Sequence, residues 1–277
     1  MPNGAAELRE PTLARRLECN GTVLESAPDP AVYIGAHDPA IQAEEYALRD
    51  NPCTAAVYQV RSTGVARVPG ILVVHEKLGL TAYVRNVARR LAKAGYVAMA
   101  PDLLWRQGGT ASFPDEATVV AAIARLDIDD TVADLRACVS ALVDLDVVIP
   151  DRIGAVGFCF GGGLTWRLAT KEPRLRVAVP FYGPNPPLAD VPAINAAVLA
   201  VYAELDDRIN PGIDEIEHAM RESGKVFDKV ILPNARHAFH NDTMAERYNP
   251  EAARKAWHVV TDWLADHLKG QRSENHR

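Results

Sequence analysis

The chain has 277 residues, with 30 lysines and arginines against 36 aspartates and glutamates, and 48% of its residues are hydrophobic. This composition is typical of a globular protein, and the length suits one or two domains. The net charge of −6 argues against a general nucleic-acid binder, because such a protein carries an excess of basic residues. No run of 18 apolar residues occurs and charges fill the first 21 residues, so we expect neither a membrane span nor a secretory signal.

The cysteine pattern indicates a protein of a reducing compartment. Cys19, Cys53, Cys138 and Cys159 do not make a disulfide framework in a chain of this length, and none forms a C-x-x-C zinc pattern. We therefore expect reduced thiols in a cytoplasmic protein, with no metal or other cofactor. Cys159 alone lies in a context that suggests reactivity.

The first part of the chain differs in pattern from the rest. Residues 1–43 show no sustained hydrophobic period, and we expect a partly irregular N-terminal extension with one short helix near 13–17. Residues 44–270 are predicted as one α/β domain. It begins with two strands within 44–62, joined by a turn at 50–52.

Strands and helices alternate from residue 70 onward. Short apolar runs rich in β-branched residues predict buried strands, and apolar residues spaced three to four apart predict helices. The predicted strands cover 70–76, 96–103, 152–159, 175–183, 196–206 and 227–235. The predicted helices cover 81–94, 114–126, 128–146, 161–171, 212–223 and 250–269. This order implies a mostly parallel sheet with helices on both faces and an active site at the carboxyl ends of the strands.

A glycine-flanked cysteine ends the predicted strand 152–159. The segment Gly157-Phe158-Cys159-Phe160-Gly161 has the form of a nucleophile elbow, with cysteine in place of serine. The glycines leave room in a tight turn, the Phe160 N–H can hold an oxyanion, and the following helix N-terminus favours a thiolate. The alternative is a buried cysteine in a glycine-rich turn. A dinucleotide site is disfavoured because the motif lies deep in the alternation, and no P-loop sequence is present.

A cysteine nucleophile needs a base, usually histidine. His237 directly follows the predicted strand 227–235, where a base should lie, and His240 is its rival three residues later. The remaining histidines lie on predicted helices, in the irregular start, in the tail or at the end of an early strand. We therefore predict His237 as the base.

The base needs an acid to orient it, and α/β-hydrolase triads place that acid between nucleophile and histidine in the chain. Glu204, Asp206 and Asp207 lie at the carboxyl end of the predicted strand 196–206 or directly after it. Asp206 is the best candidate from its position in the loop, whereas Asp207 beside Arg208 is more simply a solvated ion pair. A polar loop is the alternative.

The end of the predicted strand 70–76 provides a second set of candidates. The Lys77 N–H fits the second donor of an oxyanion hole. The Glu76 carboxylate would raise the pKa of the Cys159 thiol by repulsion. Alternatively, it would accept the thiol proton and keep Cys159 unreactive until substrate arrives. A polar strand end facing solvent is the alternative for His75 and Glu76. A metal site that joins them to the later histidines is not required by the spacing.

Five segments together resemble the dienelactone hydrolase family, which is carboxymethylenebutenolidase-like. They are HEKLGL, APDLLWRQGG, GFCFGG, AELDDRI and HAFHND, in the family's order and spacing from about residue 44 to 269. The resemblance implies an α/β-hydrolase fold and a carboxylic ester hydrolase that acts on a small ester or lactone. It also implies Cys159 as nucleophile, His237 as base, Asp206 as orienter and Glu76 as the carboxylate near the resting thiol.

The resemblance further implies an oxyanion hole from the backbone N–H groups of Lys77 and Phe160. Arg106 matches an arginine that holds the substrate carboxylate, and Tyr182 matches an aromatic residue that lines the site. Asn241 stands where dienelactone-specific members have a second carboxylate-binding arginine. One arginine instead of two weakens the hold on a carboxylate, so the family chemistry is predicted more firmly than dienelactone itself.

Two other functions stay open at this point. A glutamine amidotransferase-like enzyme also uses a G-x-C-x-G elbow, but its acid usually follows the histidine closely. A binding protein on a hydrolase scaffold would typically have lost a triad residue, and this chain keeps all three. We expect a monomer or homodimer that binds a small molecule and neither nucleic acid nor membrane.

Overall fold

The computed structural model describes residues 33–48, 56–64 and 66–270. The predicted helix near 13–17, the turn at 50–52 and two cysteines, Cys19 and Cys53, lie outside this part of the chain. The strand β1 begins at Ile41, so the sheet includes the last residues of the predicted extension.

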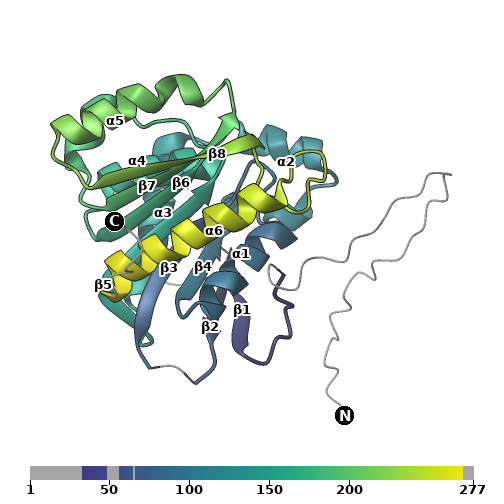
Figure 1. Cartoon of the computed structure of the whole chain (residues 1–277). Coiled ribbons are helices and arrows are strands. Elements are labelled where there is room, and N and C mark those ends of the chain that lie inside the picture. Colours follow the sequence, from purple (N-terminus) through teal and green to yellow (C-terminus); the bar gives the residue numbers. More distant parts are fainter. Residues whose placement is uncertain (1–32, 49–55, 65, 271–277) are drawn as a thin grey trace, which may run out of the picture.

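One eight-stranded sheet forms the centre of the molecule, in the order β1-β2-β4-β3-β5-β6-β7-β8 (Figure 1). β2 pairs antiparallel with β1 and β4, and every other neighbouring pair is parallel. The strands are β1 (Ile41–Ala47), β2 (Ala56–Ser62), β3 (Val68–Val74), β4 (Val97–Pro101), β5 (Val148–Phe158), β6 (Leu175–Phe181), β7 (Ala197–Leu205) and β8 (Phe227–Arg236). The predicted mostly parallel α/β-hydrolase sheet is confirmed.

The strand β5 begins four residues earlier than its apolar pattern predicts. Val148 pairs with Val68 of β3, and the exposed Pro150 and Asp151 then interrupt the run of buried residues. A prediction from apolar runs therefore starts the strand after this interruption. The backbone pairing of β5 with β3 nevertheless continues across it, after a register shift.

Six α-helices of the described chain cover the sheet and its carboxyl end. They are α1 (Ala82–Lys93), α2 (Glu116–Ile123), α3 (Ile128–Val143), α4 (Phe160–Lys171), α5 (Ile213–Glu222) and α6 (Pro250–Leu264). Short 3₁₀ turns and one π turn complete the described elements, at Trp105–Gln107, Thr110–Ser112, Leu188–Ala193, Asn210–Gly212 and Ala265–Lys269. Aspartate or asparagine side chains cap the N-termini of α2, α3 and α6 and accept a backbone N–H there.

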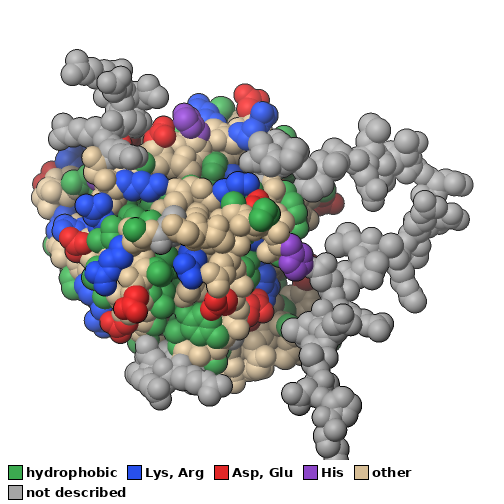
Figure 2. Space-filling view, turned by 90° about the horizontal axis from the view of Figure 1, so that it is seen from below, with side chains coloured by type: hydrophobic (Ala, Val, Ile, Leu, Met, Phe, Trp, Pro, Cys, Tyr) green, Lys and Arg blue, Asp and Glu red, His purple; other side chains and the backbone are tan. Residues whose placement is uncertain are grey.

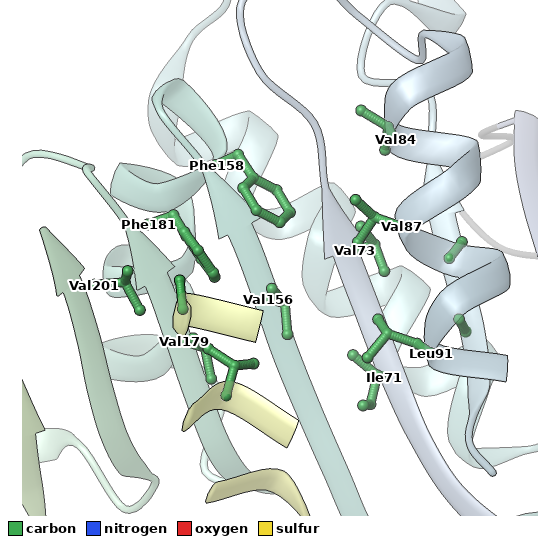
Figure 3. Close-up of a cluster of buried hydrophobic side chains, with 14 of the residues drawn as sticks. Ile71, Val73, Val84, Val87, Leu91, Val156, Phe158, Val179, Phe181 and Val201 are labelled. Carbon is green, nitrogen blue, oxygen red and sulfur yellow. The ribbon is translucent and has the colours of Figure 1, made fainter. Parts of the chain in front are cut away.

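The helices form one layer on each face of the sheet (Figure 1). Buried residues of α1 and α6 pack on one face, and those of α3, α4 and α5 pack on the other. In Figure 3 the α1 side chains Val84, Val87 and Leu91 point toward Ile71 and Val73 of β3. Because helices cover both apolar faces of the sheet, the ends of the strands are fixed in position. These strand ends carry the site described below.

The helix α2 lies apart from these layers. Its residues Val119 and Ile123 form a small apolar cluster with Leu104, and Phe160 packs against that cluster. This contact places α2 beside the junction of β5 and α4.

The visible surface mixes charges of both signs. On the face drawn in Figure 2, lysine and arginine side chains are interspersed with aspartates and glutamates, and neither sign dominates. None of the helices in the described ranges is long and apolar enough to cross a membrane.

Candidate active site

A strained turn joins β5 to α4 and carries Cys159. Its φ of 53° and ψ of −113° are a backbone conformation that L-amino acids rarely adopt. A Cβ atom on Gly157 would lie 2.2 Å from the carbonyl oxygen of Gly161, and one on Gly161 would lie 2.3 Å from that of Val74. Glycine is therefore required at both flanking positions, as the G-x-C-x-G pattern predicts.

Three strand ends bring Cys159, His237 and Asp206 together. His237 Nε2 lies 3.0 Å from Cys159 Sγ, and His237 Nδ1 lies 2.5 Å from Asp206 Oδ2. Cys159 follows β5, Asp206 follows β7 and His237 follows β8. Asp206 is buried, and its carboxylate accepts the Nδ1–H of His237. This bond holds the imidazole ring with Nε2 facing the sulfur.

The charges of this group favour a thiolate beside a protonated imidazole. Burial opposes protonation of His237, but the contacts with Asp206 and Cys159 outweigh it and raise its pKa to about 9. Burial also opposes ionisation of Cys159, yet the contact with His237 outweighs burial and lowers the thiol pKa. The Phe160 N–H, at the start of α4, donates to the sulfur and acts in the same direction.

A second buried carboxylate, Glu76, lies near the sulfur without bonding to it. Asn241 Nδ2 donates to Glu76 Oε2 at 2.7 Å, and the Tyr182 hydroxyl donates to Oε1 at 3.5 Å. Burial raises the pKa of Glu76, and the Asn241 bond opposes that rise. Glu76 also opposes thiolate formation electrostatically, raising the pKa of Cys159.

His75 and Glu76 are both buried, so the alternative of a polar strand end facing solvent is wrong for both residues. The His75 Nδ1–H donates to the Glu76 carbonyl oxygen at 2.7 Å, and Nε2 accepts the Leu103 N–H at 3.0 Å. Both ring nitrogens are engaged, and burial lowers the pKa of the imidazole. His75 therefore ties the end of β3 to the segment after β4 as a neutral side chain.

His240, the rival base, points into the protein. Its Nδ1 lies 2.7 Å from the Tyr83 hydroxyl, and its ring stacks on Phe158 with centroids 5.4 Å apart. Burial lowers its pKa well below the ordinary value. Within the described ranges no cluster of three or more histidine, cysteine or acidic residues could hold a metal ion.

A cavity of about 350 Å³ opens beside the sulfur. Its lining combines apolar side chains with two cationic residues: Lys77, Val120, Ile123, Ala124, Cys159, Phe160, Pro184, Arg208 and Ile209. The α2 helix provides one wall, which explains its position away from the two main layers. Lys77 and Phe160, the predicted oxyanion-hole residues, both border this cavity.

The other predicted substrate contacts are placed differently. Arg106 forms a bidentate ion pair with Asp134 and stacks on Trp105, and it does not line the cavity beside Cys159. Asn241 is buried and turned toward Glu76. The Tyr182 ring is fully buried against His237, with centroids 5.0 Å apart.

Arg208 is a charged cavity residue for which the sequence suggested no role at the site. The pattern predicted an ion pair with Asp207, but Arg208 Nη2 lies 3.1 Å from His237 Nε2 instead. The available signal was its position two residues after Asp206, in the loop that carries the triad acid.

Comparisons with known proteins identify the family of this chain. The profile of the dienelactone hydrolase family matches residues 55–268. A carboxymethylenebutenolidase homologue of Methylorubrum extorquens is 34% identical over 208 residues, which are 71% of each chain. A homologue in Bradyrhizobium sp., whose name describes a 2-oxo-3-(5-oxofuran-2-ylidene)propanoate lactonase, is 31% identical over 78% of this chain and 91% of its own.

A solved structure from Klebsiella pneumoniae, described as a dienelactone hydrolase, has a TM-score of 0.75 to this fold. It is 29% identical and covers 82% of this chain and 99% of its own. The profile match covers more than half of the chain and includes the elbow, the acid and the histidine. The chain belongs to the dienelactone hydrolase family and is a hydrolase of that type.

Proposed function

We propose that the protein hydrolyses small esters or lactones with a Cys159–His237–Asp206 triad and an acyl-enzyme intermediate. The observation that carries this proposal is the continuous contact from Asp206 through His237 to a cysteine that borders a cavity. The family is a carboxylic ester hydrolase family, and the cavity has room for a small substrate.

The reaction follows from the charges at the site. The Cys159 thiolate attacks the carbonyl carbon, and the carbonyl electrons move to oxygen to form an oxyanion. Lys77 and Phe160 both line this cavity, and their backbone N–H groups would stabilise that charge. His237 then gives its proton to the departing alkoxide, leaving a thioester; from a lactone, the alcohol stays attached to the acyl group.

Water completes the cycle. The neutral His237 accepts a proton from water, the resulting hydroxide attacks the thioester, and the carbonyl re-forms with loss of the thiolate. The carboxylic acid product leaves, and the Cys159–His237 ion pair is restored. Asp206 keeps the ring oriented throughout.

Glu76 has an electrostatic role in this scheme. Its bonds to Asn241 and Tyr182 fix the carboxylate near the sulfur, where it limits the acidity of the resting thiol. Direct transfer of the thiol proton to Glu76 has less support, because the hydrogen bond of the sulfur goes to His237.

The test is hydrolysis of a dienelactone and of p-nitrophenyl acetate by wild type, Cys159→Ser and Cys138→Ala. Cys138 is the matched control, since it is a buried reduced cysteine of α3. We expect Cys159→Ser to lower kcat/KM by at least about 10³-fold on any substrate that wild type cleaves, and Cys138→Ala to lie within about twofold of wild type.

The outcomes separate the alternatives. Near-wild-type hydrolysis by Cys159→Ser would refute the nucleophile. A wild-type protein that cleaves neither compound, yet is stabilised thermally by one of them, would favour a binding protein. Release of ammonia from glutamine would favour the amidotransferase reading instead.

A further inference from the structure

We propose that His75 is a positioning residue of the oxyanion hole. Its ring holds the peptide bond between Glu76 and Lys77 so that the Lys77 N–H points into the cavity beside Cys159. This inference rests on the proposed hydrolase function, because an oxyanion forms only if Cys159 attacks a carbonyl group. It gives a role to a buried histidine that the proposed reaction does not otherwise use.

One peptide unit carries both the group that His75 holds and the group that the oxyanion needs. The peptide bond between Glu76 and Lys77 is trans, so the Glu76 carbonyl and the Lys77 N–H lie in one plane and point in opposite directions. The His75 Nδ1–H donates to this carbonyl oxygen at 2.7 Å, and the Gly79 N–H donates to it at 3.1 Å. Two hydrogen bonds on the carbonyl therefore fix the direction of the Lys77 N–H.

The turn that contains this peptide unit needs such support. The bond from Gly79 to Glu76 closes a four-residue turn, in which Lys77 is a central residue. The Lys77 N–H donates to no backbone carbonyl of the described residues, and the Lys77 residue borders the cavity. If this peptide plane rotated, the Glu76 carbonyl oxygen would face the developing oxyanion and repel it.

The contacts of His75 allow only one tautomer of its ring. Nε2 accepts the Leu103 N–H at 3.0 Å, so the ring proton lies on Nδ1 and faces the Glu76 carbonyl. His75 is fully buried, and burial lowers the pKa of its imidazole, which therefore stays neutral. An imidazole held at both nitrogens fixes the peptide plane relative to the segment after β4.

The segment after β4 also holds the far end of the turn. Thr110 Oγ1 accepts the Leu80 N–H at 3.0 Å and donates to Asp102 Oδ1 at 2.9 Å. A Cβ atom on Gly79 would lie 2.3 Å from Thr110 Oγ1, so the two loops pack in direct contact. Thr110 thus fixes where the turn ends, whereas His75 fixes the orientation of its first peptide plane.

The experiment compares two reactions of Cys159 that differ in whether an oxyanion forms. p-Nitrophenyl acetate acylates the thiolate through a tetrahedral oxyanion and releases p-nitrophenolate. Methyl methanethiosulfonate reacts with the same thiolate at sulfur, forming a methyl disulfide and releasing methanesulfinate, without an oxyanion on carbon. The measured quantity is the ratio of the two single-turnover rate constants. Changes in the acidity of the thiol influence both reactions and cancel in this ratio.

We expect His75→Leu to lower the ratio by about 10²-fold, the loss typical of removing one oxyanion-hole donor. His75→Gln should stay within about tenfold of wild type, because its amide provides one donor and one acceptor in a side chain of similar reach. His240→Leu is the matched control, since it makes the same change at another buried histidine. Its ratio should lie within about twofold of wild type, because additive effects are expected at a site that does not contact this peptide.

A second measurement uses wild type alone and does not depend on the folding of a variant. The ¹⁵N NMR spectrum of the histidine rings reports which nitrogen of His75 carries the proton. We expect a neutral ring with the proton on Nδ1. A proton on Nε2, or a charged ring at neutral pH, would overturn the inference.

The kinetic outcomes separate this inference from the function on which it rests. An unchanged ratio in His75→Leu would leave His75 a merely structural role and overturn the inference, even if both rate constants fell together. A ratio in His240→Leu as low as in His75→Leu would also overturn it. In both cases the proposed function would stand. Absence of acylation in wild type would instead count against the proposed function, and the inference would fall with it.

Discussion

Two buried carboxylates lie near Cys159 and have opposite effects on it. Asp206 is 4% exposed and Glu76 is 3% exposed, so burial does not distinguish them. Asp206 contacts an imidazole that contacts the sulfur, whereas Glu76 accepts hydrogen bonds from an amide and a phenol. The first helps to keep His237 protonated beside the thiolate, and the second acts against the thiolate.

The difference teaches that partners, more than burial, set the role of a carboxylate. When the partner of a carboxylate is titratable, as His237 is for Asp206, the carboxylate acts on a third group through the proton that this partner carries. Uncharged partners fix a carboxylate in place, and its effect on the sulfur is then purely electrostatic. The Asp206 and Glu76 positions should therefore respond very differently to the same chemical change, acid to amide.

The Asp206→Asn variant should have the largest effect. The amide is nearly the same shape, but it lacks the charge and can hold the ring in the wrong tautomer, so we expect kcat/KM to fall by about 10³–10⁴-fold. The pKa of His237 should fall as well, because the Asp206 bond helps to raise it. Steady-state kinetics and the pH profile of alkylation at Cys159 measure these two effects.

Asp207→Asn is the matched control, since it removes an exposed carboxylate from the next position in the loop. Its activity should stay within about threefold of wild type. Equal losses in the two variants would mean that the general charge of the loop matters and that the specific contact with His237 does not.

The pH dependence of wild type should show the Asp206 side of the site directly. The pKa of His237 is raised to about 9, so the ring is protonated below that pH and loses its proton above it. The leaving group then lacks its proton donor, and kcat/KM should fall about tenfold per pH unit above about 9. An alkaline limb near the ordinary histidine pKa would contradict the ion pair.

Much of the fold and part of this site could be predicted from the sequence. The alternation of apolar runs and helical periods predicted the order of elements from residue 70 onward, because each strand and helix carries its own burial pattern. The elbow could be read because steric constraint at Gly157 and Gly161 leaves a local signature around Cys159. The positions of Asp206 and His237 followed from the rule that sites lie at the carboxyl ends of strands.

The side-chain partners could not be predicted in the same way. Asn241 and Glu76 are 165 positions apart in the chain, and Arg106 meets an aspartate 28 positions later. Such pairs depend on how loops fold over the sheet, which no local period records. Arg208 was misread for the same reason, since its neighbour in sequence, Asp207, is not its partner in space.

The Glu76→Gln variant should have the smallest effect on turnover and is the sharpest test of the comparison. Glutamine can still accept the hydrogen bond from Asn241, but the charge that raises the pKa of Cys159 is gone. We therefore expect iodoacetamide to alkylate Cys159 readily at lower pH than in wild type, while kcat/KM changes by less than about tenfold.

Asn241→Asp is the opposite change, because it removes the amide donor and adds an acid beside Glu76. It should shift the alkylation profile of Cys159 toward higher pH, if the added acid is ionised. A loss in Glu76→Gln as large as that in Asp206→Asn would mean that Glu76 itself takes the thiol proton. The two carboxylates would then share the chemistry, and the contrast between Asp206 and Glu76 would not hold.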